Sequence, residues 1–208
     1  MADSDIRDAI AAERHDLATI LAGLPADAWD APSLCAGWRV HEVVAHMTMP
    51  FRYSRAKVIL ELLKARGDFN RMADRCARRD AAKVSAGDLA ASIMDNVRHP
   101  WKPPGGGYGG ALSHDVIHGL DITVALGLDR VIPEDRLRIV LDGMTPKSVT
   151  FFGADLDGVE LRADDIDFTY GSGTPLHGAA QHLLLVVCGR ALPAGLIRGE
   201  ASDRYTRA

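Results

Sequence analysis

The chain has 208 residues, of which 47% are hydrophobic and 25% charged, as expected for a globular protein with a substantial core. The net charge is −4, and acidic and basic residues are interleaved, which excludes the clustered positive surface that nucleic-acid binding needs. The longest mostly apolar stretches, such as Leu183–Cys188, are too short to span a bilayer, so we expect no membrane partner.

Two helices are predicted in the first third of the chain. The first covers residues 4–24, where six apolar residues share one helical face and Gly23 with Pro25 ends the helix. The second begins near Arg39 and continues to about residue 63. Pro50 lacks the amide proton that a helix interior needs, so we expect a kink or a break there.

The middle of the chain alternates between polar segments and helices. Residues 67–83 are polar and arginine-rich, which predicts an irregular segment or a short helix. Ser85 with Asp88 resembles a capping box that opens a helix through Val97. Residues 99–110 are rich in proline and glycine and predict a loop. The next helix is expected at residues 111–126, ended by Gly127, and Pro133 is expected to start another.

The C-terminal part has a different pattern. Residues 159–163 and 166–170 alternate between apolar and polar side chains, which predicts a hairpin of short strands turning at Asp164 and Asp165. A last helix is predicted over residues 175–190. The expected fold is mainly α, with a helical bundle at residues 1–148 and a small α/β appendage, a short hairpin plus a helix, at residues 149–208.

Three widely spaced cysteines argue against a disulfide framework. An odd number of thiols, Cys35, Cys76 and Cys188, is typical of a reducing compartment, and the acidic N-terminus does not resemble a secretory signal. We therefore expect a cytoplasmic protein. Cys188 is interpreted as a core residue and Cys35 as a buried thiol.

Three histidines form the strongest candidate site. His114 and His118 are four residues apart on a predicted helix, so both imidazoles lie on one face within reach of a single ion. Such a pair can equally be a pair of core or surface histidines. His46 lies in an apolar stretch where an imidazole needs a partner, and a shared metal would supply one. The alternative is a core histidine that is hydrogen-bonded to a backbone carbonyl. We predict a metal site formed by His46, His114 and His118.

Two carboxylates are candidates to orient these ligands. Glu42 lies one helical turn before His46, and Asp121 shares the face of His118, so each could accept a hydrogen bond from a ligand imidazole. A solvated Glu42 and a packing role for Asp121 are the alternatives. The segment from His41 to His46 resembles the zincin motif HExxH but has one residue too many, so its two histidines cannot share an ion.

Several segments resemble the mycothiol-dependent maleylpyruvate isomerase family, which is part of the DinB-like superfamily. The stretch Leu34–His46 is similar to the family signature C-x-G-W-x-V-x-(D/E)-V-V-A-H, and His118–Asp121 is similar to its V-H-R-x-D helix. Residues Leu161–Phe168, Gly171–Gly173 and Leu183–Arg190 resemble its C-terminal segment, a trimmed relative of a sterol-carrier-like domain.

The resemblance implies a DinB-like four-helix bundle with a metal at one end, held by His46 and His118. The family's isomerases carry Glu at the position of His114, whereas other DinB-like proteins use three histidines. Gly119 replaces the arginine that usually follows the second ligand.

The function that these observations predict is a metal-dependent enzyme that uses a low-molecular-weight thiol such as mycothiol for S-transfer or isomerisation. Three imidazoles suit Zn²⁺ first, with Ni²⁺ or Fe²⁺ as alternatives, and leave a coordination position open. The partners would be a small-molecule thiol and an electrophilic substrate, and the protein a monomer or homodimer. No catalytic residue is predicted beyond the metal site. A metal-dependent hydrolase and a non-catalytic metal- or ligand-binding module remain the alternatives.

Overall fold

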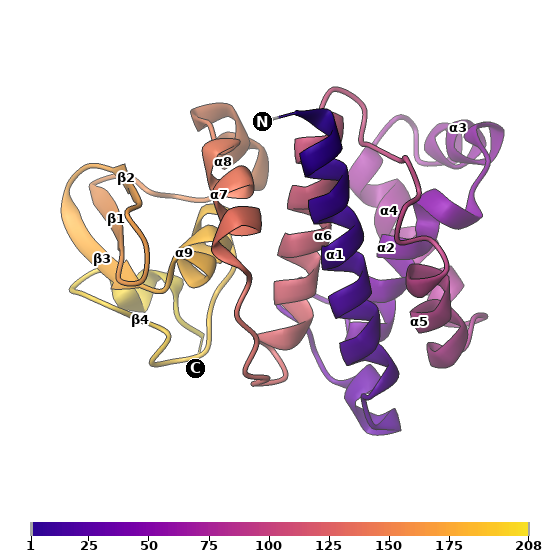
Figure 1. The fold of residues 1–208 in the computed structure, drawn as a ribbon, viewed down its shortest axis with the longest axis horizontal. Coiled ribbons are helices and arrows are strands. Elements are labelled where there is room, and N and C mark those ends of the chain that lie inside the picture. Colours follow the sequence, from indigo (N-terminus) through magenta and orange to yellow (C-terminus); the bar gives the residue numbers. More distant parts are fainter. Residues whose placement is uncertain (1, 208) are drawn as a thin grey trace. The chain divides into compact units, whose positions relative to one another are not determined.

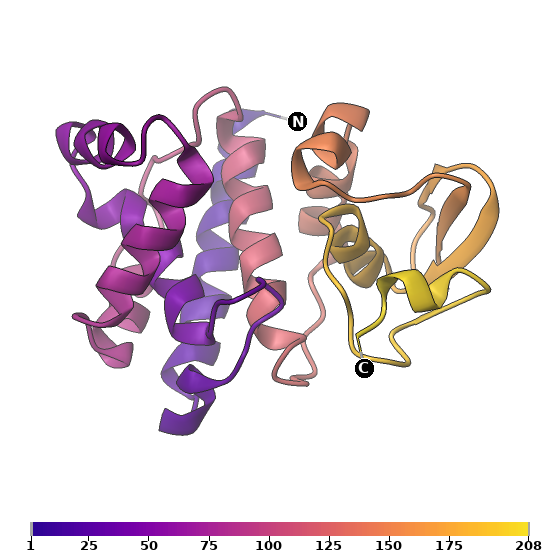
Figure 2. The ribbon, with the colours of Figure 1, turned by 180° about the vertical axis from the view of Figure 1, so that it is seen from behind.

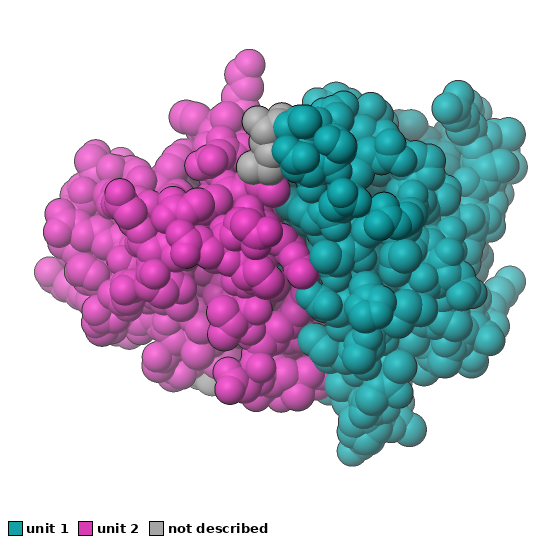
Figure 3. All heavy atoms as spheres, in the orientation of Figure 1, with its two compact units in different colours: residues 1–118 teal, residues 119–208 magenta. Residues whose placement is uncertain are grey.

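The computed structural model describes residues 2–207 and divides into two compact units, residues 1–118 and 119–208 (Figure 3). The division falls inside the long helix α6 (Gly107–Thr123). The boundary predicted between residues 148 and 149 falls inside helix α8 (Pro146–Phe152), and it stays a prediction about the domains.

The first unit is helical. Besides the N-terminal part of α6 it contains a short 3₁₀ helix, Ala26–Asp30, and the helices α1 (Asp3–Ala22), α2 (Val40–Arg52), α3 (Arg55–Lys64), α4 (Phe69–Ala81) and α5 (Ala86–Met94) (Figure 1). Side chains cap three of these helices, because Ser54, Asp68 and Ser85 each accept a hydrogen bond from a backbone amide three residues later.

Helix α2 lies at the centre of this unit and carries one of the candidate ligands. It packs against α4 and α5, and α1 also packs against α5. Figure 2 shows the same arrangement from behind. Val43, Val44 and Ala45 are fully buried, and Met47 is almost so. A helix that is apolar on most of its surface is stable only when it is surrounded, so α2 holds His46 inside the bundle and not at its edge.

The structure differs from the sequence prediction at three places in this unit. The break expected at Pro50 lies slightly later in the chain, since Pro50 is inside α2, which ends at Arg52, and α3 begins at Arg55. The polar stretch after Gly67 forms the 13-residue helix α4, because its few apolar side chains, including Met72 and Cys76, share one buried face. Helix α6 begins at Gly107, so the last glycines of the predicted loop belong to the helix.

The second unit contains the rest of α6, further helices and a small sheet. Its elements are α7 (Glu134–Asp142), α8, β1 (Val159–Ala163), β2 (Thr169–Gly171), β3 (Thr174–Gly178), α9 (Ala180–Val187), β4 (Ile197–Arg198) and a 3₁₀ helix, Ser202–Tyr205. The strand order is β2-β1-β3-β4. The apolar helix α9 contacts β1 and β3, which gives this unit a core of its own.

The predicted hairpin is present, but its second strand covers residues 169–171 and not 166–170, so the turn is longer than the one predicted at Asp164 and Asp165. The predicted last helix begins too early. Strands β1 and β2 pair antiparallel, with Leu161 opposite Tyr170. Residues 174–178, expected to start the helix, instead form β3, which pairs parallel to β1. Pro175 is tolerated because it lies near the start of a short strand, and the helix follows from Ala180.

The prediction of a mainly α fold with a small α/β appendage is therefore confirmed. Among the described residues, no helix combines the length and the apolar character that crossing a membrane requires.

Candidate metal site

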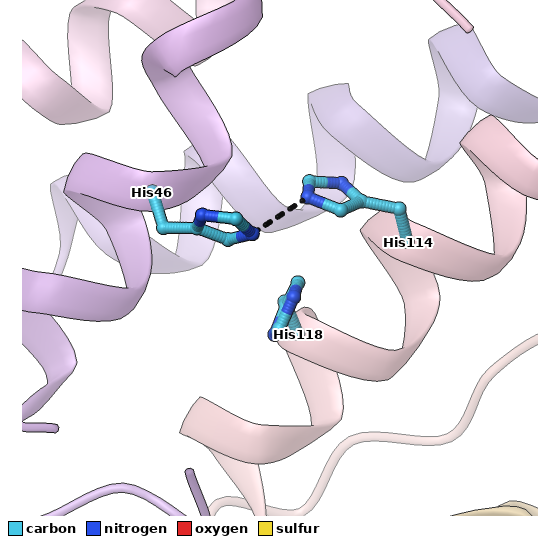
Figure 4. Close-up of side chains that lie close together, drawn as sticks. All are labelled: His46, His114 and His118. Atoms are coloured by element: carbon cyan, nitrogen blue, oxygen red, sulfur yellow. Dashed lines mark hydrogen bonds between the residues drawn. The ribbon is translucent and has the colours of Figure 1, made fainter. Parts of the chain in front are cut away.

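Three imidazoles from two helices converge inside the helical unit. His46 projects from α2, and His114 and His118 project from successive turns of α6 (Figure 4). One ligand atom from each residue lies within 4.8 Å of the others, and the ring centroids are 4.8–5.2 Å apart. The structure thus brings together the three residues that the sequence singled out, and each of them is half-buried.

The spacing of the ring nitrogens fits a metal ion. Nε2 of His46 and Nε2 of His114 are 3.3 Å apart. Two nitrogens bound to zinc at about 2.0–2.1 Å with a tetrahedral angle would be about 3.3–3.4 Å apart. A ring nitrogen of His118 lies within 4.8 Å of the ligand atoms of both other histidines, so the cluster offers three nitrogen donors. Neutral imidazoles suit zinc, nickel and iron, and three of them leave a position for a further ligand.

The geometry of α6 explains why its two histidines share a face. Residues four apart differ by about 40° around a helix, so His114 and His118 project in nearly the same direction. The other sides of this helix are apolar, since Leu112, Val116 and Ile117 are buried. Packing on those sides fixes the rotation of the helix and directs both imidazoles toward His46.

The loop before α2 brings a thiol and an indole to the site. The amide of Trp38 donates to the carbonyl of Cys35, and Gly37 between them has φ of +76°, a conformation that favours glycine. This turn places Sγ of Cys35 3.7 Å from Nδ1 of His118. It also brings the Trp38 ring close to His46, with 5.2 Å between the ring centroids. The sequence predicts a buried thiol at Cys35, whereas the structure leaves this residue half-buried and in contact with His118, a contact that the sequence analysis did not predict.

The Trp38 indole is held from its far end. Its Nε1 donates to Asp74 on α4 at 2.8 Å. A second indole, that of Trp101, lies beside the ring of His114, with 5.1 Å between the ring centroids. The candidate site therefore has apolar aromatic walls beside two of its three imidazoles, and such walls limit the access of water to the ring nitrogens.

Asp115 is the second residue that the sequence did not reveal. Its Oδ1 lies 2.9 Å from Nδ1 of His114, and its Oδ2 accepts from Nε of Arg14 on α1 at 2.7 Å. Both Asp115 and Arg14 are buried. The signal was weak because a neighbour in sequence normally points away from the same helix face, and Arg14 is 101 residues distant.

Asp115 is held in its charged form. Burial by itself raises the pKa of the Asp115 carboxyl, but the hydrogen bond with His114 and the charges of His114 and Arg14 outweigh burial and keep the pKa below its ordinary value. An ionised carboxylate accepts hydrogen bonds only, so the ring nitrogen of His114 that faces it carries the proton.

Each of the two carboxylates predicted to orient the ligands binds an arginine. Glu42 accepts from the backbone amide of Arg39 at 2.9 Å and from the Arg39 guanidinium, which places it in the first turn of α2. Asp121 accepts from Nε and Nη2 of Arg190 at 2.8 and 2.9 Å. The role of either carboxylate toward a ligand histidine stays a prediction.

His41 takes no part in this cluster, as the rejection of the zincin motif implied. Its Nε2 lies 3.0 Å from the carbonyl oxygen of Val84, and its ring contacts Trp29. Cys188 is fully buried, and burial raises the pKa of its thiol to about 12, as befits an unreactive core residue.

Fold and site together define a helical-bundle protein with a candidate metal site of three histidines. Residues 10–102 match the family model described as the mycothiol maleylpyruvate isomerase N-terminal domain. This match covers somewhat less than half of the chain, and it agrees with the resemblance found in the sequence. The match includes His46 and ends before His114 and His118.

Solved structures support the same fold. A crystal structure of a mycothiol-dependent maleylpyruvate isomerase and one of its histidine-to-alanine mutant match the chain with TM-scores of 0.57 and 0.60. Each is 13% identical, and each alignment covers 97% of this chain and 94% of the other. At this identity the likeness shows the fold alone. No curated protein sequence matches significantly.

Proposed function

We propose that the chain is a metal-dependent enzyme that uses a low-molecular-weight thiol, such as mycothiol, for isomerisation or S-transfer on an electrophilic small molecule. His46, His114 and His118 would hold a divalent transition metal, with zinc as the first choice. The observation that carries the proposal is the convergence of the three imidazoles, with two Nε2 atoms at a distance that suits one tetrahedral ion.

The residues around the cluster suit a site that stays open to a ligand. Three imidazole donors are the complement of a catalytic metal, which keeps a position for water or substrate, whereas a structural zinc has four protein ligands. A metal held in this way supplies positive charge that keeps a bound thiol in its anionic, nucleophilic form at neutral pH. The chain then needs no nucleophile of its own.

The choice of a thiol rests on the resemblance to this family. The family model, which matches residues 10–102, is named for a mycothiol maleylpyruvate isomerase, and the matching structures, whose alignments cover 97% of the chain, are named for mycothiol-dependent isomerisation. Thiolate sulfur is a soft ligand that zinc-like metals favour. The free cysteines of the described chain are consistent with the cytoplasmic location that this proposal includes.

Two measurements test the metal and the thiol separately. Elemental analysis of the purified protein should find about one divalent transition metal per chain, as a single three-histidine site requires. Cobalt-loaded protein should then develop a sulfur-to-cobalt charge-transfer band when mycothiol or a simpler thiol is added. The band should be lost in His118→Ala and retained in Glu61→Gln, a control remote from the cluster in its contacts.

The outcomes separate the competing functions. Metal binding with a cobalt spectrum that ignores saturating thiol would contradict the thiol step and favour a metal-dependent hydrolase or a non-catalytic binding module. Failure of the wild-type protein to bind zinc, nickel, iron or cobalt would overturn the metal site itself.

A further inference from the structure

A buried chain of polar contacts connects helix α1 with the candidate metal site. The Nε atom of Arg14 donates to Oδ2 of Asp115 at 2.7 Å, and Oδ1 of the same carboxylate lies 2.9 Å from Nδ1 of His114. The side chains of Arg14 and Asp115 are 1% and 3% exposed. Two charged groups have thus been removed from water, a costly arrangement that ends at a ring of the site.

Arg14 is held at several points. Its Nη1 donates to the carbonyl oxygens of Asn96 and His99 at 3.2 and 2.9 Å, and its guanidinium lies 5.0 Å from the centre of the Phe51 ring. Contacts with the segment after α5 and with α2 leave the guanidinium little freedom. The carboxylate that it binds is therefore fixed in position and in charge.

The carboxylate determines which nitrogen of His114 is free. Because Oδ2 of Asp115 accepts from Arg14, its Oδ1 faces Nδ1 of His114 as an acceptor, and this pairing favours the neutral ring with its proton on Nδ1 and the lone pair on Nε2. That Nε2 atom is the one that faces Nε2 of His46 at 3.3 Å. The contact also opposes a flip of the ring, which would turn a carbon toward the cluster.

We propose that Asp115 and Arg14 are positioning residues for the metal site: together they hold His114 with its proton on Nδ1 and its Nε2 lone pair directed at the ion. The inference rests on the proposed function in that His114 is taken as a ligand. It extends that function by assigning two residues outside the predicted set. A carboxylate behind a ligand histidine makes the ring a better donor, and losing such a partner typically costs about 10–100-fold in metal affinity.

The first test is a measurement on the metal-free wild-type protein, and a variant is used only to assign the signals. Long-range ¹H–¹⁵N NMR of the histidine rings, recorded at mildly alkaline pH, reports which nitrogen of each neutral ring is protonated. The His114 signals are assigned by their loss in His114→Gln. We expect His114 to be protonated on Nδ1. Protonation on Nε2, or an even mixture of the two forms, would overturn the proposal.

The second test compares two buried carboxylates. Asp115→Asn removes the charge behind His114 and keeps the shape, whereas Glu61→Gln does the same to a carboxylate whose partners are Lys64, Arg75 and Arg79. Cobalt and zinc affinities are measured by competition with a chelating dye, and circular dichroism reports the fold of each metal-free variant. We expect Asp115→Asn to bind the metal about 10–100-fold more weakly and Glu61→Gln to bind it as the wild type does.

The results distinguish this inference from the proposed function. If the folded Asp115→Asn variant binds cobalt as tightly as the wild type, Asp115 is a structural residue and the inference is wrong, while the metal site stands. If the wild type binds no metal, the proposed function fails, and the NMR result still decides whether Asp115 sets the tautomer of His114.

Discussion

Asp115 and Glu61 are two buried carboxylates of the helical unit, and both are paired with arginine. Glu61 on α3 accepts from Arg75 at 2.6 Å and from Arg79 at 3.0 Å, with Lys64 at 3.2 Å. Its charged partners are these three cations, and the thiol of Cys76 lies 3.9 Å from its Oε2. Asp115 uses one oxygen for Arg14 and offers the other to an imidazole of the candidate site.

The difference shows how a buried ion pair can be structural in one place and serve a site in another. The cations around Glu61 reach the surface, since the side chains of Arg75 and Arg79 are 39% and 31% exposed. Arg14 is enclosed, so the Arg14–Asp115 pair carries the larger desolvation cost. The free-energy cost of burying the Arg14–Asp115 pair is understandable if this pair orients a functional side chain.

The largest expected effect is on metal binding. Replacing His118 by alanine removes one of three donors, so we expect more than about 100-fold weaker cobalt and zinc binding, or complete loss. Glu61→Gln should leave the affinity unchanged. Dye competition measures both affinities. If His118→Ala bound the metal as tightly as the wild type, His118 would not be a ligand.

Proton competition should have a comparably large effect. Histidine nitrogens must be neutral to coordinate, so metal affinity should fall as the pH decreases through the range where histidines protonate, with up to three protons displaced per ion. Chelator competition at several pH values measures this dependence. Metal retention that is independent of mildly acidic pH would indicate carboxylate ligands in place of the three imidazoles.

Much of this contrast could not be predicted from the sequence. The spacing of His114 and His118 indicated a shared face, and the apolar surroundings of His46 indicated a buried imidazole in need of a partner. These are local patterns, and the structure brings the three rings together. The link from Arg14 to Asp115 spans 101 residues, and no periodicity in a single sequence reports such a pairing.

The fold shows the same limit. Helix α1 and the β1–β2 hairpin were predicted because their patterns lie within one element or between neighbours in sequence. Strand β3 was missed since its pairing with β1 is parallel, and its residues were assigned to the following apolar helix. For the α4 segment a helix was one of two predicted alternatives, because most of its residues are polar or charged and its few apolar residues give only a weak helical pattern.

The third prediction concerns stability. Asp115→Ala leaves the Arg14 guanidinium buried without its carboxylate, so we expect the free energy of unfolding of the metal-free protein to fall by about 3–5 kcal/mol. Glu61→Gln should cost less, about 1–3 kcal/mol, because its arginines can turn toward water. Urea unfolding of both variants measures the difference. A larger loss for Glu61→Gln would reverse the ranking of the two pairs.

The fourth prediction uses the acid dependence of the Glu61 cluster. Burial raises the pKa of Glu61, but the hydrogen bonds from Lys64 and Arg79 outweigh it and lower the pKa from 4.5 to about 2. A carboxyl with a lowered folded-state pKa stabilises the fold above pH 4.5, and this contribution is lost as the pH falls toward 2. The stability difference between wild type and Glu61→Gln should therefore shrink over that interval. A constant difference in urea unfolding across these pH values would contradict a charged Glu61.

The smallest expected effect involves the thiol of Cys35, which contacts His118 much as Asp115 contacts His114 but without a charge. Its Sγ lies 3.7 Å from Nδ1 of His118, at the long end for a hydrogen bond to sulfur. A neutral hydrogen bond contributes about 0.5–1.5 kcal/mol, so Cys35→Ala should weaken metal binding by about 2–10-fold.

Cys35→Ser provides the matched control for that loss, since a hydroxyl can also bond to the ring nitrogen and should restore most of the affinity. Dye competition on the two variants, with circular dichroism to verify the fold, separates this contact from simple packing. If Cys35→Ala lost as much affinity as Asp115→Asn, charge would not be what distinguishes the two supports. The sulfur would then have to be counted among the groups that hold the metal, because only a direct bond to the ion accounts for so large an effect from an uncharged side chain.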